Sequence, residues 1–549
     1  MKERGITYEG FVHFPTENFP AYNQPEFEGE INLGVLLARG KDGKRDTSST
    51  AIITDTGESI TYAQFDEKTD RIANALHQLG VEGGDRVVFF TDLFRSKELV
   101  YFATSAFKIT AVAYCPIAEL LIYSQVEQLV EKIQPKYLVV GEIQENSVFS
   151  LFLQDYSSQN PQKVFSMLEN NAKNSFPNLF DLNIEKKQEF SLYIENSKGL
   201  TPAFFFNTSG TTGLPKLCLH HHSSLYYTIK AFLGVYHICV SDTLLNLAGG
   251  GGSYGFISTI LPLFVGARAL IVSKADAKAV ISAQKPNVVF SGPTFYHSLL
   301  HIDYQLPATC RYLFSAGESL QETTYLEYKK RYNITLLDIN GSSELSYVYV
   351  GNTPEFNKCR SSGKIVPGYQ VKLLDENNQE IREPGKKGIM YVKGPSSCFY
   401  YKSPEAQAKV VNDGWYCTCD SFSFDAEGYY YCYGRQDDII IVRSANASPT
   451  VIENEILKRE DVLDAGVVGS YSEEQGTSLI YAGVVYKGSL EDKKEKEKEI
   501  LDWINELGRV PAYCRVTAIV LLDQLPRLGT GSKLNRKLLR EKIFSTLNN

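Results

Sequence analysis

Between residues 204 and 216 the sequence reads Phe204-Phe205-Phe206-Asn207-Thr208-Ser209-Gly210-Thr211-Thr212-Gly213-Leu214-Pro215-Lys216. The three consecutive aromatic residues predict a buried strand, which runs directly into a turn rich in hydroxyl groups and glycine. Glycine lets backbone N–H groups approach a ligand, hydroxyl groups donate hydrogen bonds, and the final lysine adds a positive charge. The turn therefore suits a polyphosphate. Its spacing is not that of a Walker loop, because only two residues separate Gly210 from Gly213.

Strand and helix patterns alternate on both sides of this turn. Apolar residues recur at helical spacing from Tyr62 to Leu79. Runs rich in apolar, β-branched and aromatic residues predict strands at 51–54, 86–90, 269–272, 288–290 and 313–315. This alternation predicts an α/β fold. Residues 143–200 are rich in Ser, Asn, Gln and Lys, and we expect a surface excursion there.

The character of the sequence changes twice in its later part. Residues 360–435 are rich in turns and short alternating strands, which predicts a small barrel or β layer. After Gly434 the pattern is that of a compact α+β segment. The most apolar long stretch, Phe256 to Ser273, contains Pro262 and Arg268, and therefore predicts a core helix and strand rather than a membrane span.

The composition argues against several classes of protein. The net charge of −8 does not suit a nucleic-acid binder. Ten cysteines in 549 residues are too sparse for a disulfide scaffold. We interpret Cys417, Cys419 and Cys432 as reduced core thiols in preference to metal ligands. The N-terminal residues lack the apolar segment of a secretory leader, so we expect a reducing cytoplasm.

Four further motifs follow the phosphate-type turn. They are Ser315-Ala316-Gly317-Glu318-Ser319-Leu320, Asp338-Ile339-Asn340-Gly341-Ser342-Ser343-Glu344, the run from Asp413 to Asp420 that leads to Gly434-Arg435-Gln436-Asp437-Asp438, and the run from Pro526 to Arg536. Together the five motifs resemble those of the adenylate-forming superfamily, which contains acyl- and aryl-CoA synthetases, peptide-synthetase adenylation domains and luciferases. Residues 338–344, 363–369 and 393–396 are most similar to benzoate-CoA ligases and related carboxylate-CoA ligases.

The resemblance implies an architecture and a two-step reaction. The architecture is α/β: a large N-terminal domain of two α/β layers and a small β-barrel (1–436), followed by a small mobile α+β domain (437–549). In the first step a carboxylic acid attacks the α-phosphate of ATP, with Mg²⁺, to give an acyl-adenylate and pyrophosphate. In the second step the thiol of CoA displaces AMP. Because transfer at phosphorus concentrates negative charge, catalysis is mostly positioning and electrostatic stabilisation.

The resemblance also implies a role for each motif of the N-terminal domain. Residues Thr208 to Lys216 hold the β- and γ-phosphates, and Glu344 binds Mg²⁺, a cation that takes oxygen ligands. Asp420 accepts hydrogen bonds from both ribose hydroxyls, and Arg435 assists at ribose or phosphate. The adenine slot is lined by Gly317, Glu318, Asp338, Asn340, Gly341, Ser342 and Ser343.

The C-terminal motif supplies the catalytic lysine that the resemblance implies. Lys533 reaches the carboxylate and the α-phosphate in the first step, and Asp437 is the hinge about which the C-terminal domain turns. The residue types alone leave structural alternatives open, namely a helix cap for Glu344, a turn for Asp420, a surface ion pair for Arg435 and one more solvated cation for Lys533.

Histidine and aromatic residues near the turn suggest the acid-binding side. His220, His221 and His222 do not suit a metal site, because consecutive side chains point in different directions. The resemblance matches His220 and His222 to a His-x-His pattern, for which we favour a structural or substrate-pocket role. Tyr254, after four glycines, takes the place of the aromatic residue that faces the carboxylate.

Two departures from the family pattern bear on the second step. In the hairpin after Asp438, Ser444 stands where the family has a glycine and Asn446 where it has a basic residue. A side chain where the backbone must approach the pantetheine closely is a steric objection to thioester formation. The last motif also holds one extra residue between Pro526 and Lys533.

The sequence thus predicts a stand-alone, AMP-forming ligase that joins an aryl or medium-chain carboxylic acid to CoA. One alternative keeps adenylation but transfers the acyl group to a carrier-protein pantetheine or an amine. The other is a degenerate relative that binds nucleotide for regulation without turnover. The retention of Lys216, Glu344, Asp420, Arg435 and Lys533 argues against the regulator, and the altered hairpin argues for it.

Overall fold

The structure is a computed structural model that describes most of the chain. The described residues are 7–8, 11–12, 30–92, 96–116, 121, 123–168, 176–184, 187–194, 201–208, 215–248, 252–272, 276–300, 302, 304–317, 320–435, 438, 440–442, 445–472, 477–488, 492–506, 509–510, 514–527 and 534–547. Within these ranges, no helix combines the length and the apolar composition that a membrane crossing requires. Two short antiparallel ribbons belong to the N-terminal part: β1 (Thr7–Tyr8) with β2 (Phe11–Val12), and β3 (Glu30–Ile31) with β10 (Tyr193–Ile194).

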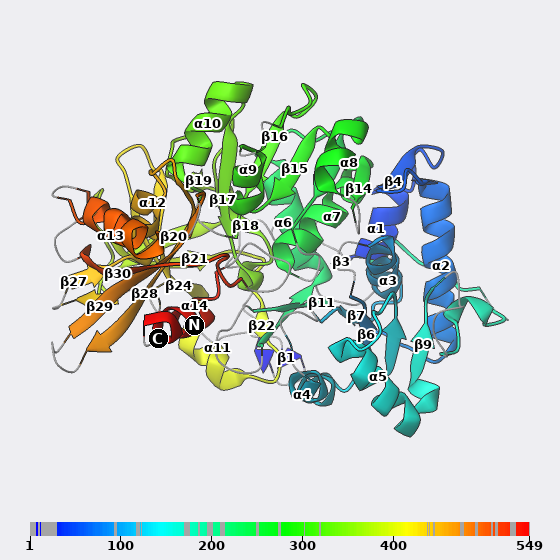
Figure 1. Ribbon diagram of the computed structural model, residues 1–549. Coiled ribbons are helices and arrows are strands. Elements are labelled where there is room, and N and C mark those ends of the chain that lie inside the picture. Colours follow the sequence, from blue (N-terminus) through cyan, green and yellow to red (C-terminus); the bar gives the residue numbers. More distant parts are fainter. Residues whose placement is uncertain are drawn as a thin grey trace.

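Two large sheets form the body of the N-terminal domain (Figure 1). The first has the strand order β22 (Phe399–Tyr400), β12 (Leu217–His221), β11 (Pro202–Asn207), β7 (Val112–Tyr114), β6 (Arg86–Phe90), β8 (Tyr137–Val140), β9 (Val164–Ser166). The second has the order β19 (Lys364–Ile365), β18 (Val348–Gly351), β17 (Leu336–Gly341), β16 (Tyr312–Ser315), β15 (Val288–Ser291), β13 (Thr243–Asn246), β14 (Arg268–Ile271), β4 (Thr50–Thr54), β5 (Ser59–Thr61). Parallel pairs occupy the middle of both sheets. Antiparallel strands stand at both edges of the second sheet and at the β22 edge of the first, whereas the opposite edge strand, β9, is parallel to β8.

Helices pack on both faces of each sheet, which accounts for the continuous apolar runs in the strands. A central layer lies between the sheets and shares their largest apolar cluster; it consists of α1 (Leu33–Arg39), α2 (Tyr62–Gln78), α3 (Lys97–Lys108), α6 (His222–Leu233) and α7 (Ser253–Val265). The outer faces are covered by α4 (Tyr123–Ile133) and α5 (Val148–Gln159) on the first sheet, and by α8 (Ala277–Gln284), α9 (Pro293–Leu300) and α10 (Glu322–Tyr332) on the second. The predicted α/β fold is confirmed, as are the strands at 51–54 and 86–90 and the helix from Tyr62.

The expected surface excursion at residues 143–200 is wrong in its first half. Residues 148–159 form α5, and β9 extends the first sheet by pairing with β8. Phe149, Phe152 and Leu153 are buried against that sheet. These three residues stand at helical spacing and share one face of the helix. The composition of the whole segment is nevertheless polar, because the residues around them are polar, and this obscured the helical pattern.

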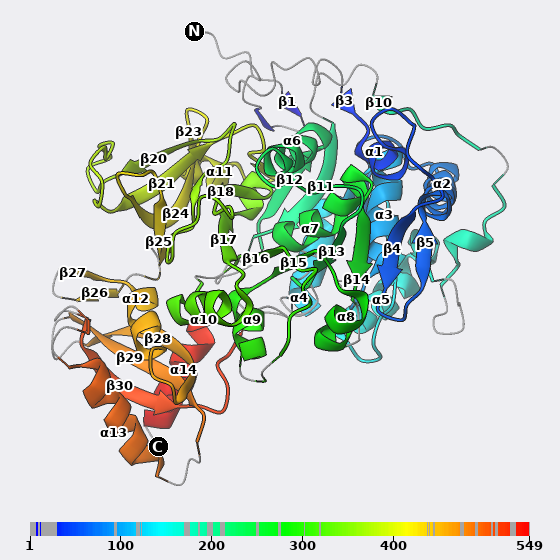
Figure 2. The ribbon, with the colours of Figure 1, turned by 90° about the horizontal axis from the view of Figure 1, so that it is seen from above.

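The β layer and the C-terminal domain follow (Figure 2). The β layer is antiparallel, with α11 (Pro404–Val410) beside it; its strands are β20 (Gln370–Leu374), β21 (Gly388–Lys393), β23 (Val411–Asn412), β24 (Trp415–Phe424) and β25 (Tyr430–Arg435). The C-terminal domain has its own apolar cluster and contains a hairpin, β26 (Ile440–Val442) and β27 (Ala445–Ala447), a sheet of β28 (Val462–Ser472), β29 (Thr477–Tyr486) and β30 (Val516–Leu521), and α12 (Pro449–Ile456), α13 (Lys493–Ile504) and α14 (Arg536–Leu547). It meets α9, where His297 Nε2 hydrogen-bonds the Leu463 carbonyl oxygen (3.1 Å).

A buried ammonium group joins three helices of the central layer. Lys108, at the end of α3, is 2% exposed. Its Nζ lies 2.7 Å from Asp66 Oδ1 and 2.6 Å from Asp70 Oδ1, and donates to Thr69 Oγ1 at 2.8 Å, all on α2. Arg39, the last residue of α1, pairs with the same two carboxylates. Because the buried charge has several partners, removal of the lysine leaves carboxylates that are incompletely compensated.

We therefore expect Lys108→Met to lower the free energy of unfolding by about 3–5 kcal/mol, the usual cost of breaking a buried ion pair. The matched control is Lys97→Met, which removes the more exposed pair with Glu58 and should cost less than about 1 kcal/mol. Urea unfolding followed by tryptophan fluorescence and circular dichroism measures both. Equal effects of the two substitutions would show that the Lys108 network adds nothing beyond a surface pair.

Candidate active site

The base of the phosphate-type turn is closed by an antiparallel ladder. β11 and β12 pair up to Asn207 and Leu217. Beyond them the Thr208 N–H donates to the Lys216 carbonyl (3.0 Å), and the Lys216 N–H donates to Thr208 Oγ1 (3.3 Å). The predicted phosphate-binding residues Ser209, Gly210, Thr211, Thr212 and Gly213 lie outside the described residues. Lys216 Nζ lies 5.0 Å from the centre of the Tyr400 ring, a cation–π arrangement.

The turn that carries Glu344 is held in place by hydrogen bonds that three successive carbonyl groups accept from outside the turn. His220 Nε2 donates to the Ser343 carbonyl, the Cys398 N–H to the Glu344 carbonyl and Ser396 Oγ to the Leu345 carbonyl, each at 2.7 Å. The turn itself is a single 3₁₀ turn, Ser343–Leu345, whose N-cap is Ser342. The capping role left open for Glu344 is therefore taken by Ser342.

This turn is also fastened to the phosphate-type turn. Ser343 Oγ donates to the Asn207 carbonyl at 2.9 Å, and the Asn207 side chain accepts from Tyr114 Oη at 2.7 Å. Asn207 is the last residue of β11 and the Ser343 turn follows β17, so the carboxyl ends of one strand from each large sheet meet here. In α/β sheets, ligands bind outside the carboxyl ends of strands.

The hydroxyl groups of Tyr400 and Tyr416 lie near the Glu344 carboxylate. Tyr400 Oη donates to Glu344 Oε1 at 2.9 Å, and Tyr416 Oη lies 3.2 Å from Tyr400 Oη. Burial and the nearby Glu344 raise the pKa of Tyr400, so it stays a neutral donor. One carboxylate with hydroxyl groups nearby fits Mg²⁺, which binds few protein oxygens and completes its shell with phosphate and water. In the described part of the chain, no cluster of three or more His, Cys, Asp or Glu side chains that could hold a metal ion is found.

The predicted adenine slot lies at the end of β17. Asp338 Oδ2 accepts from Ser362 Oγ at 3.3 Å, and burial raises the pKa of Asp338 well above 3.8. A Cβ at Gly341 would lie 2.2 Å from the Tyr347 carbonyl oxygen, so only glycine permits this backbone approach. Asn340 Oδ1 is buried and has no hydrogen-bond partner in the described part of the chain. Gly317 follows β16, and Glu318 lies outside the described residues.

The predicted ribose residues face each other across two strands. Asp420 in β24 is the register partner of Arg435 in β25, whose side chain is outside the described set. Asp420 lies within a strand, so the simple turn left open for it is wrong. Burial raises the pKa of the Cys432 thiol, and the Asp420 and Asp338 carboxylates raise it further, so both carboxylates lie near this one thiol.

The three histidines, His220, His221 and His222, are buried, and the side chains of His220 and His222 bond different parts of the chain. His222 Nδ1 accepts from the Leu33 N–H (3.1 Å), and its ring packs edge-on against Phe107. Burial lowers the pKa of His222 to about 3 and that of His220 to about 4. Both rings are therefore neutral near pH 7. His222 lies in the core, so of the two roles left open we assign it the structural one, whereas His220 braces the Glu344 turn.

Tyr254 lies on α7 against the ends of two strands of the second sheet. Its hydroxyl donates to the Phe314 carbonyl at 3.2 Å, and its ring stacks on Tyr347 with a centroid separation of 6.0 Å. Tyr347 Oη in turn bonds Ser258 Oγ at 2.8 Å. The Tyr254 hydroxyl thus bonds the backbone, and its ring is packed against aromatic neighbours. Residues 249–251, which include three of the four glycines before it, lie outside the described residues.

The residues predicted to act from the C-terminal domain lie outside the described part of the chain. Lys533 lies outside the described residues, as do the hinge Asp437 and Ser444, and nothing is described of the Asn446 side chain. Arg527 and Leu534, the described residues on either side of Lys533, form an antiparallel β-bridge. Two arginines near Lys533 in the sequence form ion pairs, Arg527 with Asp464 and Arg536 with Glu453.

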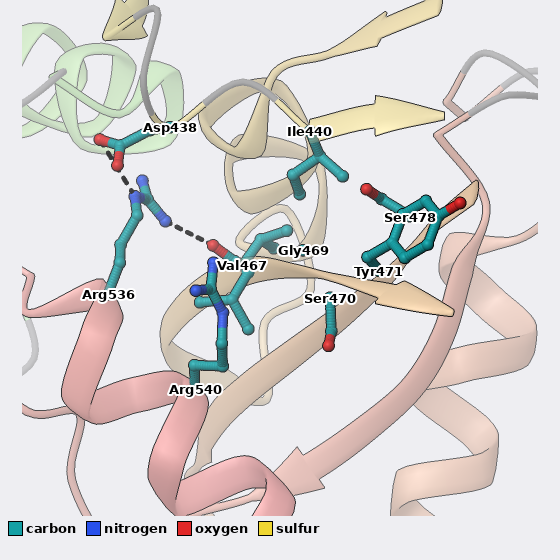
Figure 3. Close-up of a pocket in the computed structure, with 10 residues that line it drawn as sticks. Asp438, Ile440, Val467, Gly469, Ser470, Tyr471, Ser478, Arg536 and Arg540 are labelled. Atoms are coloured by element: carbon teal, nitrogen blue, oxygen red, sulfur yellow. Dashed lines mark hydrogen bonds and ion pairs between the residues drawn. The ribbon is translucent and has the colours of Figure 1, made fainter. Parts of the chain in front are cut away.

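A cavity of about 360 Å³ in the C-terminal domain is lined by residues of β26, β28, β29 and α14 (Figure 3). Arg536 lines it and donates to the Val467 carbonyl at 2.6 Å, while Asp438, next to the expected hinge, lies 3.6 Å from the Arg536 Nε. The arginine that ends the last motif therefore contacts the residue that follows the expected hinge. Sequence reasoning did not find this contact, because the two positions are far apart in the chain.

Sequence reasoning also missed the group that holds Glu344 from the other side. Tyr400 lies in none of the five motifs, and Tyr416 lies in the run from Asp413 to Asp420 but had no predicted role. Tyr400 reaches the site because β22 pairs with β12, the strand that follows the phosphate-type turn. Ser396 belongs to the stretch 393–396 that resembles benzoate-CoA ligases, but that resemblance did not reveal its bond to Leu345.

Comparison with known proteins gives the class of this one. The model of the AMP-binding enzyme family matches residues 41–401, and that of the AMP-binding enzyme C-terminal domain matches residues 451–532. The chain belongs to the AMP-binding enzyme family. The predicted membership of the adenylate-forming superfamily, with a large N-terminal and a small C-terminal domain, is confirmed, and so is the expected class of enzyme, an AMP-forming acyl-CoA synthetase.

Particular relatives are aryl-CoA ligases. The chain is 29% identical to the 3-hydroxybenzoate–CoA/4-hydroxybenzoate–CoA ligase of Thauera aromatica over 89% of this chain and 93% of that protein. It is 30% identical to the benzoate–CoA ligase of the same organism over 61% of this chain and 65% of that protein. The anthranilate CoA ligase AuaEII, solved with anthranoyl-AMP, has a TM-score of 0.84 at 24% identity and covers 96% of this chain and 100% of its own, which shows the fold.

The buried Asp338 carboxyl generates a prediction about stability. Its pKa is raised in the folded chain, so folding becomes less favourable as pH rises from 3.8 through the raised value. Asp338→Asn keeps the shape and the Ser362 contact but cannot ionise. We expect it to raise the thermal unfolding midpoint of the ligand-free protein by about 2–4 °C at pH 8, and to have no such effect near pH 4. Scanning calorimetry at both pH values measures this, and an equal or lower midpoint at pH 8 would contradict it.

Proposed function

We propose that this chain activates a small aromatic carboxylic acid with MgATP and transfers the acyl group to CoA. The observation that carries the proposal is the Ser343–Asn207 hydrogen bond, which holds the Glu344 turn against the base of the phosphate-type turn. A carboxylate beside a phosphate-type loop suits a metal–polyphosphate complex. The relatives named for hydroxybenzoate, benzoate and anthranilate support an aromatic acid.

The first half-reaction divides between groups on both sheets. Thr208 to Lys216 grips the β- and γ-phosphates, which leave as pyrophosphate. Glu344 holds Mg²⁺, and the ion, when bound, offsets the charge on the phosphoryl oxygens. Asp420 and Arg435 bind ribose, and the end of β17 with Gly317 and Glu318 encloses adenine. Lys533 approaches the acid carboxylate and the α-phosphate, where its positive charge stabilises the developing negative charge.

The surroundings of Tyr254 support a planar substrate. Phe290 and Phe314 stack with centroids 4.9 Å apart and planes at 12°, and the Tyr254 ring meets Phe290 nearly edge-on. Aromatic rings favour flat partners in offset or edge-on geometry. Phe290 and Phe314 are fully buried and therefore support Tyr254 from within the core. We propose that Tyr254 itself meets a benzoate-like acid whose carboxylate points toward the α-phosphate. A medium-chain acid is the weaker candidate.

The second half-reaction needs a movement of the C-terminal domain. We propose residues 1–436 and 437–549 as the two domains, with Asp437 as the hinge. The hairpin β26–β27 then faces the pantetheine arm. Ser444 is the point of steric objection, yet the relatives with high coverage are named as CoA ligases, which favours CoA over a carrier protein or an amine.

Lys533→Ala tests the assignment of the catalytic lysine. Loss of one donor to the transition state costs about 2.7–4 kcal/mol, so ATP–pyrophosphate exchange should fall by about 10²–10³. The matched control is Lys537→Ala, an exposed lysine on α14, which should keep exchange within about twofold of the unaltered enzyme. Unchanged exchange in Lys533→Ala would overturn the assignment.

A panel of acids decides the substrate and the acceptor. Benzoate, hydroxybenzoates, anthranilate and octanoate are each incubated with MgATP, and pyrophosphate and AMP are followed with and without CoA. We expect an aromatic acid to give thioester and AMP only with CoA. Adenylate without thioester would point to another acceptor. No turnover with any acid would favour a nucleotide-binding regulator.

The hydroxyl of Tyr400 should set the affinity for the metal. Tyr400→Phe removes the bond to Glu344 but keeps the ring beside Lys216. We expect the Mg²⁺ concentration that half-saturates ATP binding, measured by calorimetry, to rise about tenfold, as for other groups that orient metal ligands. AMP binding without metal should not change. Tyr328→Phe, which removes another buried hydroxyl, is the control, and an equal Mg²⁺ requirement in both variants would contradict the prediction.

A further inference from the structure

Two thiols lie side by side on the strand that carries the proposed ribose ligand. Cys417 and Cys419 belong to β24, immediately before Asp420 (Figure 2). Their Sγ atoms are 3.8 Å apart, and both side chains are part-buried. A disulfide bond is about 2.05 Å long, so a movement of less than about 2 Å would join them. The adenylation chemistry uses neither thiol.

The local shape of β24 creates this approach. In a regular strand, alternate side chains share a face but stand about 6.6 Å apart along the strand, which is near the upper limit for a disulfide. Here Cys419 has a φ of +59°, in the left-handed region that side chains rarely adopt. The pairing of β24 is also irregular on both edges, between Ile389 and Tyr391 on β21 and between Asp420 and Phe422 toward β25. The bent strand turns the two thiols toward each other.

The chemical surroundings distinguish this pair from the other close pair of thiols. Cys218 and Cys398 also hydrogen-bond each other, but both are fully buried and burial raises the pKa of each, which disfavours the reactive thiolate. Cys417 and Cys419 are accessible in part. The Tyr391 hydroxyl hydrogen-bonds Cys417, and burial together with the two nearby thiols raises the pKa of Tyr391 to about 12. Tyr391 therefore remains a neutral donor that can stabilise a thiolate at Cys417.

We propose that Cys417 and Cys419 form a reversible modification site, which a small-molecule disulfide such as glutathione disulfide oxidises to an intrachain disulfide. One cysteine loses its proton to solvent, and its thiolate attacks the glutathione disulfide, forming a mixed disulfide and releasing one glutathione thiolate. The thiolate of the second cysteine attacks the mixed disulfide and releases the other glutathione. Two protein thiols are oxidised, one external disulfide is reduced to two thiols, and the two protons pass through solvent to the leaving thiolates.

The Cys417–Cys419 disulfide affects the proposed nucleotide site through Thr418, the residue between the two cysteines. Thr418 Oγ1 donates to the Met390 carbonyl at 2.9 Å and accepts from the Asp420 N–H at 3.1 Å. A bond between residues 417 and 419 closes a small ring around Thr418, so its backbone and the attached Asp420 must shift. Because Asp420 binds ribose in the proposed function, on which this consequence rests, oxidation weakens nucleotide binding.

The experiment uses the full chain, reduced and then equilibrated with glutathione disulfide. After the remaining thiols are alkylated, peptide mass spectrometry should find the 417–419 peptide lighter by two hydrogen atoms, while Cys218 and Cys398 are alkylated as thiols. AMP binding, measured by calorimetry, should weaken about tenfold, the effect of impairing a charged hydrogen bond, and dithiothreitol should restore it. In Cys417→Ser and Cys419→Ser, the oxidant should leave AMP affinity unchanged.

The outcomes separate the proposal from the function on which it rests. A 417–419 peptide that keeps both thiols, or a stable glutathione adduct there, overturns the modification site in the unaltered protein, without need of a variant. A proven disulfide with unchanged AMP affinity overturns the coupling through Asp420. A reduced protein that binds no AMP refutes the proposed function, while the peptide map still decides the fate of the two thiols.

Discussion

Three consecutive carbonyl groups, those of Ser343, Glu344 and Leu345, each accept a hydrogen bond from a distant part of the chain, one from His220 and two from the segment 396–398. A turn outside a sheet has backbone groups that the sheet does not satisfy, and buried backbone groups require partners. Here His220, from the strand after the phosphate-type turn, and Cys398, from just before β22, supply two of them. The arrangement fixes the Glu344 carboxylate without using the carboxylate itself.

The rest of the candidate site depends on this anchoring. The turn follows a strand of the second sheet, whereas its donors lie in or beside strands of the first, so the turn ties the two sheets together at their carboxyl ends. Burial lowers the pKa of His220 and so keeps it neutral, which allows it to donate one hydrogen bond without adding a charge beside the proposed metal site. Tyr400 completes the arrangement, because it contacts both Glu344 and Lys216.

Much of the architecture was predictable because it is written in local patterns. The strand at 86–90 and the helix from Tyr62 follow from residue spacing. The expectation of a surface excursion was wrong for the first half of 143–200. Three apolar residues among many polar ones are enough to form α5, because they pack on an apolar face of the first sheet. Its strand β9 is short, and it forms because β8 offers an edge. Such edges do not exist until distant segments have paired.

The sequence by itself determined the chemistry, because motifs such as Thr208–Lys216 and Asp338–Glu344 specify residue types and order, and these suffice to indicate a nucleotide and a carboxylic acid. Only the tertiary structure decided which groups meet. The pairing of β22 with β12 brings Tyr400 to Glu344, and the bend at Cys419 brings its thiol to 3.8 Å from that of Cys417. The physical reason is that register and backbone bends arise from long-range packing, which residue spacing along the chain does not encode.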